Sequence, residues 1–200
     1  MSTTAKGDAF EQRVYDALAE ELRNERLCAS PRNAKIFKKK AYYSRDRGAS
    51  IFTDVSIELF LPGRERPSLV WNFECKHYAS TIPVDDIEEF HAKLQQIRED
   101  NTKGTFVTSG ALQRSALAYA QSKGIGVIRL LPDDQVVIVM ELLTIRSLEE
   151  ASEVDWSEFL SAVTTPQHRS SRAFFAAQDG YWFPNWYSLL SHELSLDDTV

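Results

Sequence analysis

The sequence is poor in cysteine and contains no long apolar run. Among its 200 residues there are two cysteines, Cys28 and Cys75. Two thiols cannot build a disulfide framework or a four-ligand zinc site, although one isolated bridge stays arithmetically possible. No stretch approaches the roughly 18 to 20 apolar residues of a membrane span, and residues 1–6 lack the apolar region of a secretory signal. We therefore expect a soluble, cytoplasmic protein that has no membrane contact and no thiolate-held cofactor.

Charge is unevenly distributed along the chain. Residues 1–132 carry 20 Lys and Arg against 17 Asp and Glu, whereas residues 133–200 carry 3 against 12. The net charge of −6 therefore divides into +3 and −9. One basic cluster lies within residues 32–47, opposed only by Asp46, and comprises Arg32, Lys35, Lys38, Lys39, Lys40, Arg45 and Arg47. The cluster could face phosphates; equally, it could be a solvated strand edge where lysines discourage unwanted pairing.

Apolar periodicity predicts an α/β domain over residues 1–132 and a C-terminal extension over residues 133–200. At 43% hydrophobic residues, the chain can bury a substantial core. Helical spacing of apolar side chains and runs of β-branched and aromatic residues are the two signals used. They predict helices over 7–27, 84–100 and 112–123, and strands over 33–43, 51–60, 68–76, 104–108 and 125–131.

The order of these segments predicts a mixed central sheet. Residues 51–60 alternate, with Val55, Ile57 and Leu59 on one face and Asp54, Ser56 and Glu58 on the other, and residues 68–76 return after a turn as the second strand of a hairpin. The later strand, helix and strand imply a parallel pair joined by a right-handed crossover.

The C-terminal extension is acidic and rich in aromatic residues, and its role is unknown from sequence. We expect a strand over 136–142 and a helix over 156–163. Seven of the fourteen residues in 174–187 are aromatic. Such a cluster is expected to pack against the main domain; the alternative is a surface for a protein partner or a dimer contact.

The triplet Glu74-Cys75-Lys76 at the end of a predicted strand is the strongest candidate for chemistry. Residues two apart on a strand share a face, so a carboxylate and an ammonium project together, and Asp54 on the neighbouring strand offers a second carboxylate. Two close carboxylates repel unless a cation lies between them, and hard oxygen ligands suit Mg²⁺ or Mn²⁺. A triplet of this kind is common by chance, and an ordinary cross-strand ion pair is the alternative.

Several separate segments together resemble the PD-(D/E)xK restriction-endonuclease-like nucleases, and within them the Mrr-like group. The likeness spans residues 6–131. It is carried by Gly7-Asp8-Ala9-Phe10-Glu11, by Asp54, by Glu74-Cys75-Lys76, by residues 103–110 and by Gly124-Ile125-Gly126-Val127-Ile128. The resemblance implies a restriction-endonuclease-like core: a leading helix, a mixed central sheet and flanking helices.

The resemblance also implies roles for individual residues. Asp54 and Glu74 would be catalytic carboxylates that bind Mg²⁺, with the peptide carbonyl of Cys75 as a further ligand and Mn²⁺ able to substitute. Lys76 would orient or deprotonate water, or neutralise the scissile phosphate. Glu11 would contact the metal or its water. Glu58 shares a strand face with Asp54 and could replace it.

The expected activity is an Mg²⁺-dependent endodeoxyribonuclease that serves restriction or antiviral defence, with DNA bound at the basic cluster. Cleavage of both strands would need two sites, and hence a homodimer. Two alternatives stay open: a non-catalytic nucleic-acid-binding or assembly module with the same fold, and a repair or junction-resolving nuclease. His77 is expected to face away from Glu74 and to have a structural or surface role, with acid-base work as the alternative. Tyr42, Tyr43 and Tyr78 are expected to be core residues that could otherwise contact nucleic acid.

Overall fold

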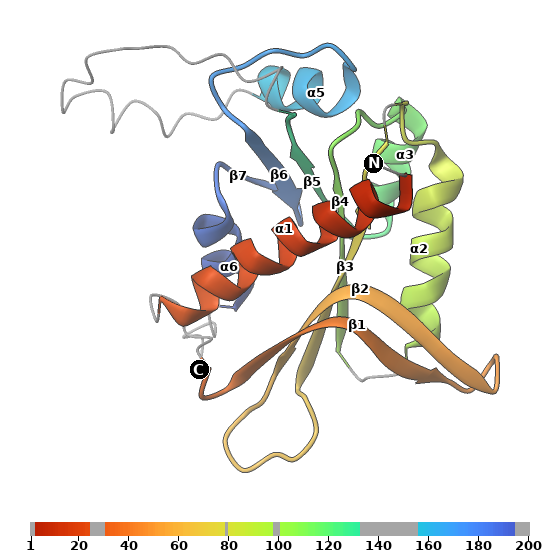
Figure 1. Cartoon of the computed structure of the whole chain (residues 1–200), viewed down its shortest axis with the longest axis vertical. Helices are drawn as coiled ribbons and strands as arrows, with labels where there is room; N and C mark the ends of the chain where they lie inside the picture. Colours follow the sequence, from red (N-terminus) through yellow and green to blue (C-terminus); the bar gives the residue numbers. More distant parts are fainter. Residues whose placement is uncertain (1–2, 25–30, 79, 98–100, 133–155, 195–200) are drawn as a thin grey trace.

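A seven-stranded mixed sheet covered by helices on both faces forms the molecule (Figure 1). The computed structural model describes residues 3–24, 31–78, 80–97, 101–132 and 156–194. The strands are β1 Ala34–Ser44, β2 Ala49–Leu59, β3 Leu69–Lys76, β4 Thr102–Thr108, β5 Gly126–Leu130, β6 Phe174–Gln178 and β7 Tyr181–Phe183. The helices are α1 Thr3–Arg23, α2 Val84–Gln96, α3 Arg114–Ser122, α5 Trp156–Thr164 and α6 Trp186–Leu194. The expected α/β class is confirmed.

The strands follow one another across the sheet in the order of the sequence. The pairs β1–β2 and β2–β3 are antiparallel, the pairs β3–β4 and β4–β5 are parallel, and the pairs β5–β6 and β6–β7 are antiparallel. The predicted hairpin of β2 and β3 and the predicted parallel pair of β4 and β5 are therefore confirmed. Helix α2 connects β3 to β4, and α3 connects β4 to β5.

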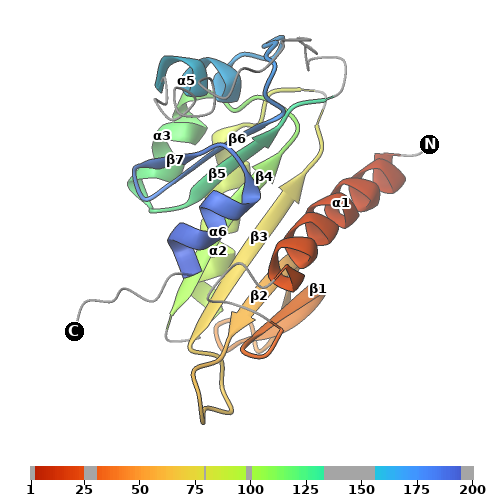
Figure 2. The same ribbon diagram turned by 90° about the vertical axis from the view of Figure 1, so that its left-hand side faces the viewer.

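Helices α1 and α6 cover one face of the sheet, and α2, α3 and α5 cover the other (Figure 2). Along α1, an apolar side chain every fourth residue is buried against the sheet: Phe10, Val14, Leu18 and Leu22. Each such burial contributes about 1.5–3 kcal/mol, which docks α1 across the strands. On the opposite face, Phe90 of α2 and Phe106 of β4 are packed with their ring centroids 6.2 Å apart.

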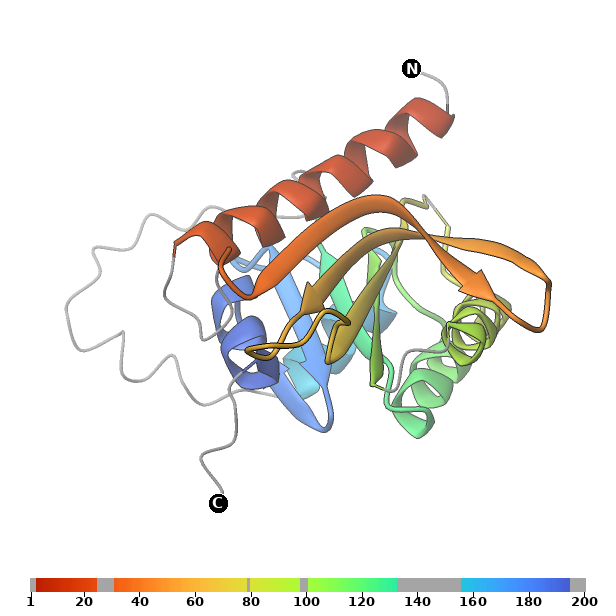
Figure 3. The same ribbon diagram turned by 90° about the horizontal axis from the view of Figure 1, so that it is seen from below.

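Part of the β1–β2 hairpin extends beyond the rest of the sheet. The pairing of β2 with β3 ends at Val55 and Phe73, whereas β1 and β2 stay paired as far as Ser44 and Ala49. Residues 40–53, which we term the arm, project past the end of α2 (Figure 3). Only one face of the arm is covered, so Tyr43 is 64% exposed and is not the core residue expected from the sequence.

The segment after residue 173 continues the same sheet. Strand β6 pairs with β5, and a two-residue turn at Asp179 and Gly180 returns the chain as β7. Both turn residues have positive φ, +49° and +83°, the combination found in tight hairpins. The predicted helix over 156–163 is confirmed as α5, whereas the predicted strand over 136–142 lies outside the described residues. The domain boundary at residue 132 stays a prediction.

Among the described residues, no helix combines the length and the apolar character that a bilayer crossing requires.

Candidate active site

The candidate site forms where β2 and β3 stop pairing. Val55 and Phe73 are the last paired residues, so the next positions, Asp54 and Glu74, stand opposite each other one step beyond the ladder. The Oδ2 atom of Asp54 accepts a hydrogen bond from the backbone N–H of Cys75 at 2.8 Å. A side-chain oxygen thus replaces the strand carbonyl that a longer ladder would supply. The carboxylate of Asp54 is thereby fixed beside the end of β3.

Glu74 is the most deeply buried acid of this group, with a side chain 5% exposed. Its Oε1 atom accepts a hydrogen bond from Nζ of Lys93 in α2 at 2.8 Å. Its Oε2 atom is buried without a hydrogen-bond partner among the described residues. Burial, followed by the negative charge of Asp54, raises the pKa of Glu74 above its ordinary value, although Lys93 and Lys76 act in the opposite direction. The site therefore holds a carboxylate whose negative charge is incompletely compensated.

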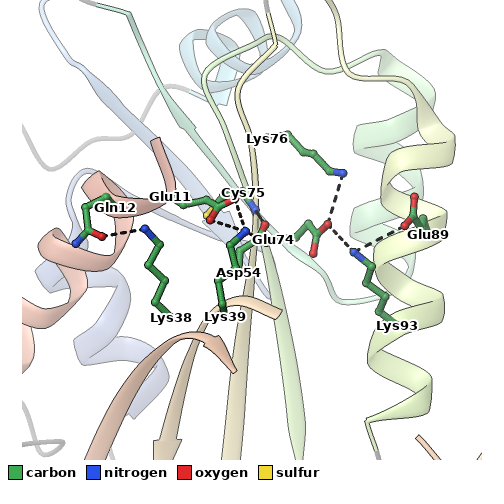
Figure 4. A network of polar contacts seen from close by, with 10 residues as sticks. All are labelled: Glu11, Gln12, Lys38, Lys39, Asp54, Glu74, Cys75, Lys76, Glu89 and Lys93. Atoms are coloured by element: carbon green, nitrogen blue, oxygen red, sulfur yellow. Dashed lines mark hydrogen bonds and ion pairs between the residues drawn. The ribbon is translucent and has the colours of Figure 1, made fainter. Parts of the chain in front are cut away.

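Lys76 lies on the same side of β3 as Glu74, as the two-residue spacing predicts (Figure 4). Its Nζ atom is 3.5 Å from Oε1 of Glu74 and 3.7 Å from Oδ1 of Asp86 in α2. Burial alone would lower the pKa of Lys76, but the carboxylates of Glu74 and Asp86 contribute to a net upward shift. The ammonium is thus charged and loosely held.

Glu11 reaches the site from α1 through a lysine. Lys39 of β1 donates to Oε1 of Glu11 at 2.7 Å and to Oδ1 of Asp54 at 3.3 Å, so one ammonium bridges the two acids (Figure 4). Lys39 has a positive φ of +52°, and its neighbours have different partners: Lys38 bonds Gln12 of α1, whereas Lys40 bonds Glu58 of β2. The usual alternation of a strand is broken at Lys39, which directs its side chain to the site.

Glu58, the alternative to Asp54, lies elsewhere on β2. It stands opposite Val70 and is four residues from Asp54, about 13 Å along a strand. Its Oε1 atom is 2.5 Å from Nζ of Lys40 and 3.0 Å from the hydroxyl of Tyr42. Ser56 and Glu58 are both buried, so this face of β2 is polar without being exposed. Of the two acids, Asp54 is the one beside Glu74.

Cys75 contributes its backbone. Its N–H points toward β2, where it bonds Asp54, and the N–H and C=O of one strand residue point to the same neighbour. The Cys75 carbonyl is therefore also turned toward the end of β2. Burial, together with the negative charges of Asp54, Glu11 and Glu74, raises the pKa of the Cys75 thiol well above its ordinary value. The sulfur is thus a neutral core atom, packed with α1.

The basic cluster is only partly available to a ligand. Lys39 and Lys40 are held by carboxylates, as described above, and Lys35 lies over the ring of Phe60 at 4.8 Å. Arg47 donates to Oε1 of Gln96 in α2 at 2.8 Å, which braces the arm. Arg45 is exposed in the turn of the arm. Several of these side chains therefore organise the protein itself.

Comparison with known proteins bears on this arrangement. Residues 6–140 match the model of a restriction endonuclease family, Mrr_cat, and the match covers more than half of the chain. The chain belongs to this restriction endonuclease family. The resemblance inferred from the sequence motifs is confirmed, and so is the expected restriction-endonuclease-like core with its mixed sheet.

Two other comparisons add little to the family match. The search of curated proteins finds no significant match. One similar solved structure is the crystal structure of a protein of unknown function, AF1548. It is 16% identical, the match covers 72% of this chain and 75% of that chain, and the TM-score is 0.39. Nothing about function follows from a likeness at this level.

The Mrr_cat family has the restriction-endonuclease-like fold, which typically uses divalent metals, so the donors at the site can be tested for fit. Within the described residues, no group of three His, Cys, Asp or Glu side chains forms a metal site by itself. Two carboxylates remain, Asp54 and Glu74, and the buried Oε2 of Glu74 has no hydrogen-bond partner. Hard oxygen donors suit Mg²⁺, which usually keeps several waters and takes one or two carboxylates. The donor set fits such an ion.

Two lysines at this candidate site were not assigned to it from the sequence. Lys93 in α2 forms an ion pair with Glu74. The sequence signal for Lys93 was its spacing of four residues from Glu89, which puts both side chains on one helix face. In the structure these two side chains are 3.7 Å apart. Lys39 was assigned to DNA binding. Its positive φ, which breaks the strand alternation, has no signal in the sequence.

Proposed function

We propose that this protein is a divalent-metal-dependent endodeoxyribonuclease of the Mrr_cat family, acting in restriction or defence against foreign DNA. One observation carries the proposal. Glu74 is a buried carboxylate with an unbonded oxygen, it faces Asp54 across the end of a strand ladder, and Lys76 follows on the same side. A structural ion pair would not require the second acid, which raises the pKa of Glu74.

We assign roles to the residues that lie around the end of the β2–β3 ladder. Asp54 and Glu74, with the Cys75 carbonyl, would hold Mg²⁺ or Mn²⁺. A bound divalent ion polarises the phosphodiester and lowers the pKa of water. Asp54 is positioned by the N–H of Cys75, and Glu74 is positioned by Lys93. Lys76, whose contacts are long, directs its ammonium to the non-bridging oxygens of the scissile phosphate and stabilises the charge that develops there.

We propose that the arm contacts the DNA beside this site. Tyr43 and Phe52 are 64% and 61% exposed, and Arg45 lies in the turn of the arm. The covered face of the arm is braced by packing of Tyr42 with Val70 and Ile97. A two-stranded ribbon fits the major groove of DNA, and exposed aromatic side chains can contact bases or sugars. The proposed phosphate contacts are Arg45 and Arg47 of the arm and, earlier on β1, Lys35 and Lys38.

The part of one chain that the structure describes offers one such site, so cleavage of both strands would need two copies. We therefore propose a homodimer on DNA. The acidic C-terminal extension is proposed as the region available to a protein partner.

The test is cleavage of supercoiled plasmid by purified protein with Mg²⁺, with Mn²⁺ and with EDTA. Glu74→Gln and Asp54→Asn should abolish cleavage, because each removes one of the two anionic donors. Glu89→Gln is the matched control: Glu89 contacts the same Lys93 but is 63% exposed and offers nothing to an ion between β2 and β3. It should cleave like the unmodified protein.

Two results would remove this proposal. Cleavage that survives both Glu74→Gln and Asp54→Asn would show that the acids are structural. DNA binding without cleavage in either metal would favour a non-catalytic binding module. Cleavage restricted to branched or damaged DNA would support the proposed chemistry but would indicate a repair nuclease in place of a restriction enzyme.

A further inference from the structure

A hollow lies next to the end of β3, on the α1 side of the sheet. It has a volume of about 390 Å³ and is lined by Lys6, Ala9, Phe10, Arg13, His77, Ser109 and Pro132. His77 directly follows Lys76, but it faces the other way: its ring stacks on Phe10 of α1 with centroids 5.4 Å apart. The hollow therefore begins one residue beyond the Glu74-Cys75-Lys76 triplet, on the opposite side of the same strand.

The lining of this hollow has one sign of charge. Lys6 and Arg13 lie seven residues apart on α1, about two turns, so both project on one face of the helix. Both are exposed, and neither forms an ion pair with any residue that the structure describes. Among the lining residues there is no carboxylate. Lys39, Lys40, Lys76 and Lys93 differ in this respect, because each contacts an acid.

The hollow also contains neutral hydrogen-bonding groups at its base. The Oγ atom of Ser109 is 2.7 Å from Nδ1 of His77, and Ser109 itself is 4% exposed. This contact fixes the imidazole, whose Nε2 has no hydrogen bond to a described residue. The backbone of Ser109 is tied to β3 and β5 through the carbonyl of Lys76 and the side chain of Arg129. Two cations, an imidazole and a hydroxyl thus converge on a fixed strand end.

We propose that this hollow is a phosphate-binding subsite that holds a phosphodiester flanking the cleaved one. The proposal rests on the proposed nuclease function for its position. His77 directly follows β3 and is two residues from Cys75, about 7 Å along a strand. A DNA strand advances 3.4 Å along its axis at each nucleotide, so a phosphate held here would lie one or two nucleotides from the cleaved one. The ligand is a phosphate oxyanion, and DNA is its source.

The test measures DNA binding in EDTA, so that no cleavage occurs. A fluorescent duplex oligonucleotide is titrated at several salt concentrations against the unmodified protein, Arg13→Ala and Lys6→Ala. Loss of one phosphate contact should weaken binding about tenfold and lower the slope of log affinity against log salt by about 1. Arg13→Lys should keep most of the slope, because the charge remains.

The matched control is Arg23→Ala. Arg23 lies at the other end of the same helix, where its Nε bonds the carbonyl of Ala19. The Arg23→Ala substitution removes one positive charge far from the hollow and should leave the salt slope unchanged. A slope that falls equally in Arg23→Ala and Arg13→Ala would overturn the subsite, as would an unchanged slope in Arg13→Ala.

A second readout uses inorganic phosphate as the probe. The imidazole NMR signals of His77 should shift with saturation in the metal-free protein, and the shift should be lost in Arg13→Ala. No shift of His77 would overturn the subsite. Failure of the nuclease proposal is separate, because it would appear as absent plasmid cleavage with these binding results intact.

Discussion

Lys76 and Arg129 stand in one row across one face of the sheet, yet their surroundings are opposite. Lys76 pairs in register with Thr108, and Thr108 pairs with Arg129. The guanidinium of Arg129 is buried and donates to the carbonyl oxygens of Ser109, Ala162, Thr165 and Pro166. The side chain of Lys76 is 21% exposed, and its ammonium has two carboxylates at 3.5 Å and 3.7 Å.

The difference separates a structural cation from one available for chemistry. Arg129 ties α5 and the segment after it to β5, and burial lowers its pKa to about 10 without removing its charge at neutral pH. Its donors are directed at fixed carbonyls. Lys76 has long contacts and keeps exposed surface, so a substrate phosphate can approach its ammonium. Changes at the two positions should therefore have opposite consequences for activity and stability.

The largest effect is expected for Lys76→Met. Removal of a charged donor aimed at the transition state should lower the single-turnover cleavage rate about 100- to 1,000-fold. The free energy of unfolding should fall by about 1 kcal/mol or less, because the contacts of Lys76 are long and Glu74 keeps its hydrogen bond from Lys93. Urea denaturation of the same preparations provides the control. If Lys76→Met lost activity only in proportion to the fraction of unfolded protein, Lys76 would be a structural cation like Arg129.

Arg129→Met should show the reverse. It leaves several buried carbonyls without their donor, at about 1–3 kcal/mol for each that stays unsatisfied. We expect the free energy of unfolding to fall by about 3 kcal/mol or more, measured by urea denaturation. Below its melting temperature the variant should still cleave plasmid. A stable but inactive Arg129→Met would place this arginine in the chemistry.

How far the sequence predicts the molecule depends on whether a signal is local. The stripe of Phe10, Val14, Leu18 and Leu22 is periodic, and the helix and its buried face are both as expected. Strands β6 and β7 are too short to show a two-residue period. The aromatic residues there predicted a packed cluster but no strands. The Asp179-Gly180 dipeptide, a strong signal for a tight hairpin, was the available clue.

In the candidate site, too, local features were predictable from the sequence and tertiary features were not. The two-residue spacing of Glu74 and Lys76 is a property of one strand, and the structure has both on one side of it. The choice between Asp54 and Glu58 depended on the register of β2 against β3, which a single sequence does not contain. Lys93 depended on the rotation of α2 over the sheet. These features are tertiary, and they are the ones that sequence patterns left open.

The next effect concerns Glu74 in the absence of metal. Because its pKa is raised in the folded protein, its contribution to stability is present below its unfolded pKa and is lost as pH rises through the folded value. Glu74→Gln cannot lose a proton, so its advantage over the unmodified protein in EDTA should grow with pH and then level off. Urea denaturation across a pH series measures this difference.

Bound metal should make the unmodified protein more stable than Glu74→Gln. Saturating Mg²⁺ stabilises only a form that binds it, so it should raise the melting temperature of the unmodified protein and leave Glu74→Gln unchanged. Equal stabilisation of both proteins would mean that the ion binds away from Glu74.

The smallest effect is expected for Lys93→Met. Lys93 opposes the upward shift in the pKa of Glu74, so its removal should raise that pKa further. The acidic limb of the pH profile for cleavage should then move to higher pH, and any loss of plateau rate should be smaller than in Lys76→Met. Glu89→Gln, which removes the other partner of Lys93, should leave the limb in place. An unmoved limb in Lys93→Met would show that Glu74 does not control the profile.

The claim that Asp54 and Glu74 share one divalent ion is tested most directly by anomalous diffraction from a crystal soaked in Mn²⁺. The account predicts one strong peak between these two carboxylates and next to the Cys75 carbonyl, and no such peak in Asp54→Asn. A peak bound at Glu58, or no peak at the end of β2 and β3, would contradict it.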